Sequence, residues 1–234
     1  MLIICDALHA DHAHLLGVDT AIETVRPTPG LWSLPFLKQT FEEGRWDDTV
    51  YVGANGYIGY IDHSRLHAVV VPDATTAIEA IHPRTVTDAA VETLQTYPDK
   101  RCVIHFMQPH VPMFTPDGPI TDVWEQVRGG EVDDETLRGW YAENVRFVAP
   151  YVQEVTAAAD GKVVITADHG ENLGERRWGI KRYGHSHLTP ECRLVPWLEL
   201  PVTERREVSH GPPRETTQLD AAALEDRLAA LGYR

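Results

Sequence analysis

One stretch decides how this chain folds: Val164-Ile165-Thr166-Ala167-Asp168-His169-Gly170-Glu171. It is a short apolar run that ends in an adjacent aspartate and histidine, as a buried strand does when polar side chains follow its carboxyl end. The pair presents a hard oxygen ligand and an imidazole at one point, and Gly170 lets the backbone turn away sharply after it. We therefore expect a buried sheet whose carboxyl end carries reactive side chains.

Further short apolar runs alternate with helical stretches along the chain. The runs are nearly continuous, which is typical of a sheet with both faces covered. Apolar residues at three- and four-residue spacing predict helices over 34–41, 84–97 and 134–159, and Pro150 should kink or divide the last one. These features predict an α/β fold, a mainly parallel central sheet sandwiched by helices, with strands at Leu2–Cys5, Thr49–Val52, Ala68–Val71, Cys102–Phe106, Lys162–Thr166 and Leu194–Leu198.

The length of 234 residues suits one domain with a substantial core. We assign residues 1–200 to this compact domain. After Pro201 the chain becomes charged and then rich in glycine and proline, which indicates an exposed linker. An amphipathic C-terminal helix is expected from Leu219 to Leu231, so that residues 201–234 form a linker and a helix.

The charge balance restricts the partners of the protein. There are 21 Lys and Arg against 35 Asp and Glu, a net charge of −14, so the chain lacks the clustered cations that a nucleic-acid backbone requires. No apolar run approaches the ~20 residues of a membrane span, and the first run meets Asp6 before it could serve as a signal-peptide core. The three cysteines have no metal-ligand spacing, which favours a reducing compartment. We expect a soluble cytoplasmic protein, and a homo-oligomer is compatible with these features.

Lysine is rare among the basic residues of this chain, and arginine is common. Only four of them are lysines, Lys38, Lys100, Lys162 and Lys181. An acidic, lysine-poor composition resembles that of proteins from salt-loving archaea, whose carboxylates keep them hydrated in concentrated salt. An ordinary acidic cytoplasmic protein is the alternative.

Four polar segments lie where strands of the predicted sheet end or shortly afterwards. Asp6 follows the first strand, and Asp168 with His169 follows the fifth. His110 lies in the loop after the strand that contains His105, and a lone histidine inside a strand is most often a hydrogen-bonded core residue. The last segment is Tyr183-Gly184-His185-Ser186-His187, preceded by the basic pairs Arg176-Arg177 and Lys181-Arg182, for which solvated loop charge is the simplest interpretation.

Taken together, these segments resemble the sulfatase and alkaline phosphatase superfamily, and in particular small sulfatase-like proteins of haloarchaea. The resemblance runs through nearly the whole chain up to the C-terminal helix. It rests on the opening Asp6-Ala7-Leu8 with Asp11-His12, on Gln108-Pro109-His110, on Tyr141-x-x-Asn144-Val145, and on Thr166-Ala167-Asp168-His169-Gly170-Glu171 followed by Gly184-His185 and Leu194-Val195-Pro196-Trp197-Leu198-Glu199. The resemblance implies a divalent metal ion held by Asp6, Asp168 and His169, with a metal-bound hydroxyl or modified cysteine as nucleophile.

Two hydroxyls compete for the role of nucleophile, Thr28 and Ser33. Ser33 precedes an apparent helix by one residue, where helix amides can hold an anion, and Ser33-x-Pro35 resembles the nucleophile-x-Pro spacing of sulfatases. We therefore prefer Ser33, although a simple helix cap is the alternative for this residue. The arginine that sulfatases carry two residues after that proline is Leu37 here, which leaves phosphate monoesters and diesters open beside sulfate esters.

The implied activity is hydrolysis or transfer of a phosphate or sulfate ester through a covalent intermediate on Ser33. His110 and His185 would contact the anionic oxygens or protonate the leaving group, facing the cluster from opposite sides of a gap for a tetrahedral anion; His187 is the alternative to His185. Oxygen and imidazole ligands suit Zn, Mn, Mg or Ca. The expected substrate is a small anionic ester, with a saccharide or a lipid head-group as its remainder. A family member that only binds an anionic ligand or partner is the second hypothesis.

Overall fold

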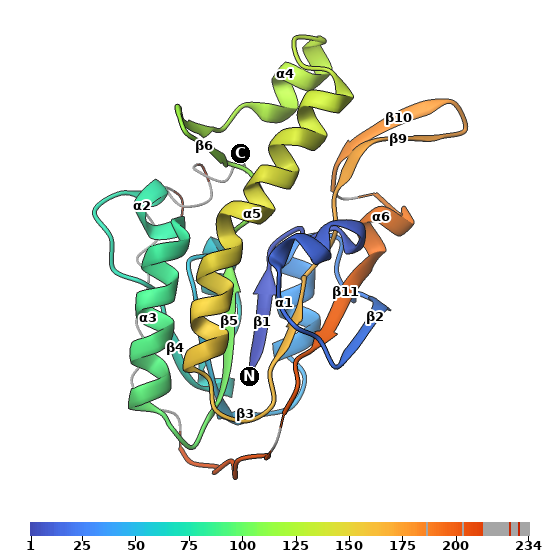
Figure 1. Cartoon of the computed structure of the whole chain (residues 1–234). Coiled ribbons are helices and arrows are strands. Elements are labelled where there is room, and N and C mark those ends of the chain that lie inside the picture. Colours follow the sequence, from blue (N-terminus) through green and yellow to red (C-terminus); the bar gives the residue numbers. More distant parts are fainter. Residues whose placement is uncertain (186, 203, 213–224, 226–228, 230–234) are drawn as a thin grey trace.

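The computed structural model describes residues 1–185, 187–202, 204–212, 225 and 229. Its centre is a seven-stranded sheet (Figure 1). The inner strands pair in parallel, whereas β11 is antiparallel to both of its neighbours. In spatial order the strands are β2 (Ile22–Pro27), β11 (Leu194–Glu199), β8 (Val164–Thr166), β1 (Leu2–Cys5), β5 (Arg101–Phe106), β3 (Trp46–Gly53) and β4 (Leu66–Val70).

Helices cover both faces of this sheet (Figure 1). α3 (Pro83–Thr96) and α5 (Asp134–Ala158) lie on one face, and α1 (Ser33–Phe41) lies on the other. Successive residues of a strand point to opposite faces of the sheet. Ile3 therefore packs in the core shared with α3 and α5, whereas Ile4 packs with α1. The predicted α/β fold with a covered, mainly parallel sheet is confirmed.

Shorter elements connect the layers. Two small antiparallel hairpins, one of β6 with β7 and one of β9 with β10, stand apart from the main sheet. The remaining elements are the 3₁₀ helices η1 (Ala10–Leu16), η2 (Gly56–Tyr60) and η3 (His63–Arg65), the helices α2 (Ala77–Ile81), α4 (Val123–Gly129) and α6 (Pro190–Arg193), and the strands β6 (Met113–Thr115), β7 (Gly118–Ile120), β9 (Asn172–Arg177) and β10 (Ile180–Gly184).

All six predicted strands are present, and the sequence missed one strand of the main sheet. β2 lies at the sheet edge and is mostly exposed, so it lacks the apolar run by which the others were found. Pro150, expected to kink or divide the last long helix, does not divide it, because α5 continues through this residue as one helix. The packing of α5 against the sheet outweighs the local loss of a backbone hydrogen bond.

The described part of the predicted linker, residues 201–202 and 204–212, contains no helix or strand. It runs along the lower end of the sheet (Figure 1), where the Lys100 ammonium donates to the carbonyl oxygen of Ser209 over 3.0 Å. The predicted helix from Leu219 to Leu231 lies outside the described residues, except for two positions. Among the helices that the structure describes, none combines the length and apolarity needed to cross a membrane.

Candidate metal centre

The carboxyl ends of β1 and β8 bring Asp6, Asp168 and His169 to one point. One ligand atom from each of the three lies within 4.8 Å of the others, and all three side chains are buried. His169 Nε2 is 3.3 Å from Asp6 Oδ1 and 3.6 Å from Asp168 Oδ2. The convergence predicted from the strand ends is therefore present, although more than 160 positions separate Asp6 from the pair.

Local backbone contacts hold this cluster in place. Asp168 Oδ1 accepts hydrogen bonds from the backbone N–H groups of Ala7, at 3.2 Å, and His169, at 2.9 Å. The next residue must be glycine, because a Cβ at Gly170 would lie 2.0 Å from the carbonyl oxygen of Glu191. The close approach lets the Gly170 N–H donate to the Cys192 carbonyl over 3.0 Å.

Four buried atoms around this point have no hydrogen-bond partner among the residues that the structure describes: Asp6 Oδ1, Asp168 Oδ2, His105 Nε2 and His169 Nε2. Unpaired buried polar atoms are costly, and four at one place indicate a missing common partner. His169 donates through Nδ1 to the Gly170 carbonyl at 3.0 Å, which places the lone pair of its neutral ring on Nε2. These donors fit a divalent cation with oxygen and imidazole ligands.

Without a cation, the positive charge beside the two carboxylates is a proton on the His169 ring. Burial lowers the pKa of His169, but the carboxylates of Asp168 and Asp6 outweigh burial and raise the pKa to about 10. Burial raises the pKa of Asp6, and His110 and His169 more than reverse this and hold it well below its usual range. Asp6 is therefore an anion at neutral pH beside a protonated imidazole, the arrangement that a bound cation would replace.

The two candidate nucleophiles differ in what their hydroxyls contact. Ser33 opens α1, is fully buried, and donates to Asp6 Oδ2 over 3.1 Å. The hydroxyl of Thr28 instead donates to the backbone carbonyl oxygen of Asp168, so it supports the strand end rather than facing the ligand atoms. The first turn of α1 has no side-chain cap, which leaves it available to an anion beside Ser33.

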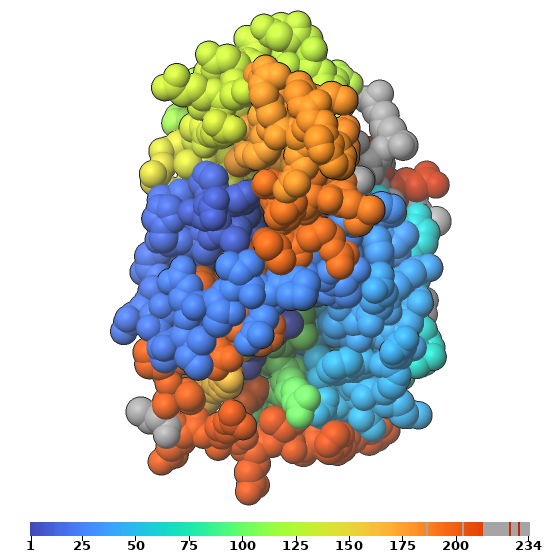
Figure 2. Space-filling view, turned by 90° about the vertical axis from the view of Figure 1, so that its right-hand side faces the viewer, coloured from blue at the N-terminus to red at the C-terminus, as the bar shows by residue number. Residues whose placement is uncertain are grey.

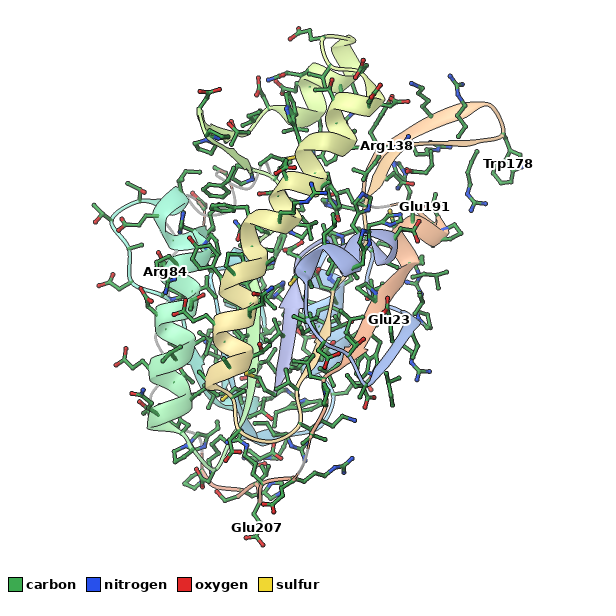
Figure 3. The ribbon with its side chains drawn as sticks, viewed as in Figure 1. Glu23, Arg84, Arg138, Trp178, Glu191 and Glu207 are labelled. Carbon is green, nitrogen blue, oxygen red and sulfur yellow. The ribbon has the colours of Figure 1, made fainter. Side chains whose placement is uncertain are left out.

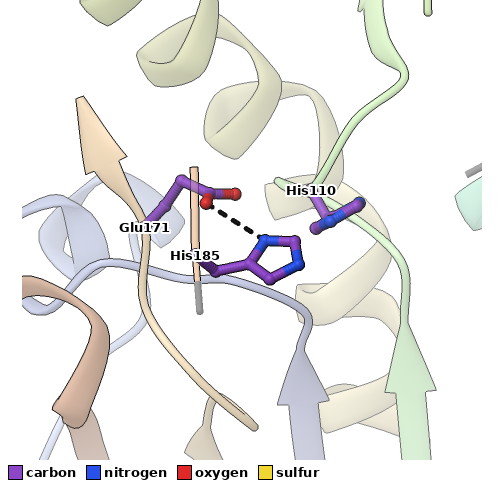
Figure 4. Close-up of side chains that lie close together, drawn as sticks. All are labelled: His110, Glu171 and His185. Atoms are coloured by element: carbon purple, nitrogen blue, oxygen red, sulfur yellow. Dashed lines mark hydrogen bonds and ion pairs between the residues drawn. The ribbon is translucent and has the colours of Figure 1, made fainter. Parts of the chain in front are cut away.

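A second group of ligand atoms lies beside the first. His110, Glu171 and His185 each place one such atom within 4.8 Å of the others, and His185 Nδ1 donates to Glu171 Oε1 over 3.2 Å (Figure 4). Burial raises the pKa of Glu171 to about 7 and lowers the pKa of His185 to about 3. The pKa of His110 is also lowered, chiefly by burial.

The prediction that His110 and His185 face the cluster from opposite sides is wrong. Their ring centroids are 5.1 Å apart, and the His185 ring is 4.6 Å from that of His169, so the imidazoles gather on one side. The hydrogen bond to Glu171 draws His185 there. His187 belongs to neither ligand group, which favours His185 as the site residue of this loop.

Sequence reasoning missed three side chains of the site. His105, expected as a core histidine, is buried with its Nδ1 2.7 Å from the Tyr51 hydroxyl, but its Nε2 faces Asp6 at 3.7 Å and Asp168 at 3.8 Å. Asn55 donates to Asp6 Oδ2 over 3.0 Å, and Glu171 joins the second group. Asn55 and Glu171 follow the ends of β3 and β8, so the strand-end argument applied to every strand would have found them.

α5 supports both loops that carry the site. The Tyr141 hydroxyl donates to the Ala7 carbonyl at 2.6 Å and accepts from the His9 N–H at 2.8 Å. One turn further along, Asn144 donates to the Pro109 carbonyl at 3.0 Å. The spacing of Tyr141 and Asn144 thus places one helix face against the loops after β1 and β5.

Several solved structures have a similar overall fold. The C-terminal periplasmic domain of EcEptC from Escherichia coli, in complex with Zn, is 13% identical with a TM-score of 0.60, over 86% of this chain and 72% of that one. The C-terminal periplasmic domain of the phosphoethanolamine transferase EptC from Campylobacter jejuni is 16% identical with a TM-score of 0.56, over 85% and 77%. The 2-O GAG sulfatase BT1596 is 15% identical with a TM-score of 0.56, over 99% and 70%.

The chain therefore shares its α/β fold with solved structures of a phosphoethanolamine transferase domain and a sulfatase. No protein-family model matches the sequence, and no curated protein matches it. The superfamily resemblance of the sequence thus agrees with the structure at the level of the fold, while the roles of individual residues rest on the geometry of the site.

Proposed function

We propose that the protein is a metal-dependent hydrolase or transferase of phosphate or sulfate esters, with Ser33 as the nucleophile. The observation that carries this proposal is the Ser33 hydroxyl, 3.1 Å from Asp6 Oδ2, beside four buried ligand atoms that make no hydrogen bond to the described residues. Solved structures with this fold include a phosphoethanolamine transferase and a sulfatase, which supports the same class of reaction.

Asp6, Asp168 and His169 would hold the cation, with His105 Nε2 at the edge of the same point. Zn, Mn, Mg and Ca all suit these donors, and one structure with this fold was solved with Zn. A bound cation would lower the pKa of the Ser33 hydroxyl and offset the charge that develops on the transferred group.

The chain's own residues account for the remaining chemistry. Asp6 Oδ2 accepts a hydrogen bond from the Ser33 hydroxyl and orients it, and the hydroxyl proton passes to solvent water when the nucleophile forms. Ser33 Oγ then bonds to phosphorus or sulfur as the bond to the leaving oxygen breaks, and the uncapped start of α1 binds the anion. Water or another acceptor finally takes the group from Ser33, which separates hydrolysis from transfer.

His110 and His185 are proposed to contact the anionic oxygens and to deliver the proton that the leaving oxygen needs. His110 Nδ1 donates to the Val111 carbonyl over 2.8 Å, and His185 Nδ1 donates to Glu171, so both rings direct Nε2 away from these partners. Each Nε2 must take up a proton from solvent before it can donate to the leaving oxygen, and the Glu171 carboxylate beside His185 would stabilise the imidazolium that forms.

The transferred group is the least specified part of the proposal. Leu37, in the position where sulfatases carry arginine, belongs to α1 and is fully buried among apolar side chains, so it offers an anion no hydrogen bond. Phosphate monoesters and diesters are therefore substrates to test beside sulfate esters.

The test is hydrolysis of p-nitrophenyl phosphate, bis-p-nitrophenyl phosphate and p-nitrophenyl sulfate in molar KCl. Metal-depleted protein receives Zn, Mn, Mg or Ca in turn. We expect turnover of at least one ester with at least one cation, and its loss in Ser33→Ala with metal affinity weakened at most. Ser64→Ala is the matched control, because Ser64 is an exposed serine far along the chain from the site.

Mass spectrometry of the intact chain, quenched during turnover, should show one phosphoryl or sulfuryl group on Ser33. If the metal-loaded protein binds phosphate or sulfate but turns over none of the esters, the non-catalytic, anion-binding hypothesis replaces this one. If Thr28→Ala abolishes turnover while Ser33→Ala does not, the assignment of the nucleophile is wrong.

A further inference from the structure

The hairpin of β9 and β10 has an unusual residue at its tip. Arg177 pairs with Ile180, so Trp178 and Gly179 form a two-residue turn. Both have positive φ, 49° at Trp178 and 79° at Gly179, a geometry that favours Asn-Gly. A tryptophan at positive φ is strained, and this one is 94% exposed, so it contributes almost nothing to the core.

Other apolar side chains are exposed on the same part of the molecule. Ile180 is 57% exposed beside the tip, and Leu188 is 85% exposed just beyond β10. The hairpin projects from the body of the protein, and Trp178 lies at its far end, pointing away from the sheet (Figure 3). In the space-filling view the orange segment that contains this hairpin lies at the surface (Figure 2).

The shaft of the hairpin is basic although the chain carries a net charge of −14. Lys181 forms an ion pair with Asp134 at 2.6 Å, and Arg177 approaches Glu191 at 3.9 Å. Arg176 and Arg182 have no carboxylate partner within 4.0 Å among the described residues. Four cations therefore flank an apolar tip within the seven residues 176–182.

The hairpin begins and ends at the second ligand group. β9 starts directly after Glu171, β10 ends directly before His185, and the base is closed by Asn172 Nδ2, which donates to the Gly184 carbonyl over 2.9 Å. The base of the hairpin is therefore continuous with the second ligand group, while its tip projects away from it.

We propose that this hairpin tip docks the protein on an anionic lipid bilayer. Tryptophan is enriched at membrane interfaces, and cations beside it are attracted by anionic head-groups. A narrow two-stranded tip fits insertion between head-groups better than the flat patch of about 800 Å² per partner that a stable protein interface needs. The inference rests on the hairpin alone and does not depend on the proposed catalysis.

The experiment is co-sedimentation of the full chain with vesicles of phosphatidylcholine, either pure or containing phosphatidylglycerol. It uses the lowest KCl concentration at which circular dichroism shows the folded protein. We expect binding to the anionic vesicles and little to the neutral ones. Trp178→Ala should weaken binding about tenfold at every salt concentration, and Arg176→Gln with Arg182→Gln should weaken it about tenfold in low salt only.

The matched control is Arg26→Gln with Arg45→Gln, which removes the same charge from exposed arginines outside the hairpin. This control should bind anionic vesicles nearly as well as the unaltered chain. The proposal is overturned if no vesicle binds, if Trp178→Ala binds as tightly as the unaltered chain, or if the control loses as much as the hairpin variant. If Trp178→Ala instead abolishes self-association in analytical ultracentrifugation, the tip binds a second copy of the chain and not a membrane.

Discussion

The candidate metal-ligand group and the hairpin of β9 and β10 depart from the usual distribution of side chains in opposite ways. The first buries charged atoms, and the second exposes a large apolar side chain. At the carboxyl ends of β1 and β8, one carboxylate oxygen of Asp6 and one of Asp168 are buried without a hydrogen-bond partner among the described residues. At the hairpin tip, Trp178 is exposed and strained. The two regions are joined directly, because β9 and β10 emerge from Glu171 and His185.

The two regions differ in how firmly the rest of the protein supports them, and this decides which substitutions can test each one. The ligand group rests on rigid strand ends and on α5, so its geometry is set before any ligand arrives. The hairpin packs little of its tip, so substitutions there should leave the core intact. A departure from local folding rules that brings no gain in packing marks a candidate functional site. Here such departures predict catalysis at the ligand group and docking at the hairpin tip.

The largest expected effect comes from comparing two carboxylates, one in the ligand group and one that contacts the hairpin. Asp168→Asn should lower metal affinity more than about 100-fold and abolish turnover, because it removes a charged ligand atom from the buried group. Asp134→Asn, which weakens the partly exposed contacts of this residue with Lys181 and the Tyr183 hydroxyl, should leave both unchanged. Isothermal titration calorimetry measures the affinity. Equal losses in the two variants would contradict a metal centre confined to the strand ends.

The next effect concerns the histidine at the base of the hairpin. His185→Ala should lower kcat by roughly 10²–10⁴, the range for a positioned acid or base, with a much smaller loss of metal affinity. His187→Ala, two residues on and outside both ligand groups, is the control and should keep its kcat. Steady-state kinetics on the best p-nitrophenyl ester decide this. A silent His185→Ala with an inactive His187→Ala would show that the loop is assigned in the wrong register.

A smaller effect is the pH dependence of metal affinity, which follows from the protonation of His169. The carboxylates raise its pKa to about 10, so the ring is protonated at neutral pH and a cation must displace that proton. Metal affinity should therefore rise with pH below this value, by about tenfold per unit, with about one proton released per cation. Calorimetry in buffers of different ionisation enthalpy measures the proton count. An affinity that is constant from pH 6 to pH 9 would show that His169 is not a ligand.

The smallest expected effect concerns the exposed charges rather than the buried ones. The surface carboxylates behind the −14 charge repel one another over a Debye length of about 10 Å at 0.1 M salt and about 3 Å at 1 M. Tm should rise with KCl, by about 3 °C for each kcal/mol of repulsion that is screened. Calorimetric scans from dilute to molar KCl provide the measurement. A flat Tm would remove the resemblance to proteins of salt-loving archaea while leaving the metal centre untouched.

Most of the fold and part of the site could be predicted from local patterns in the sequence. Continuous apolar runs identified six strands, and the rule that parallel strands end at one edge predicted that Asp6 would meet Asp168. Edge strand β2 was missed because an exposed strand carries no apolar run. The relative placement of His110 and His185 was wrong, because loop side chains are aimed by contacts that no local pattern contains.

The sequence by itself determined the α/β class and the order of polar residues after the strands, since periodicity and strand-end positions are local properties. The preference for Ser33 came from its place before an apparent helix and from the resemblance of Ser33-x-Pro35 to the sulfatase spacing. Only the tertiary structure decided that His105 faces the carboxylates, that Glu171 joins His110 and His185, and that Trp178 is exposed. The physical reason is that the direction of a buried side chain depends on what packs behind it. Tyr51 holds the His105 ring, and the backbone at Glu191 excludes any side chain at Gly170, although neither neighbour is close in the sequence.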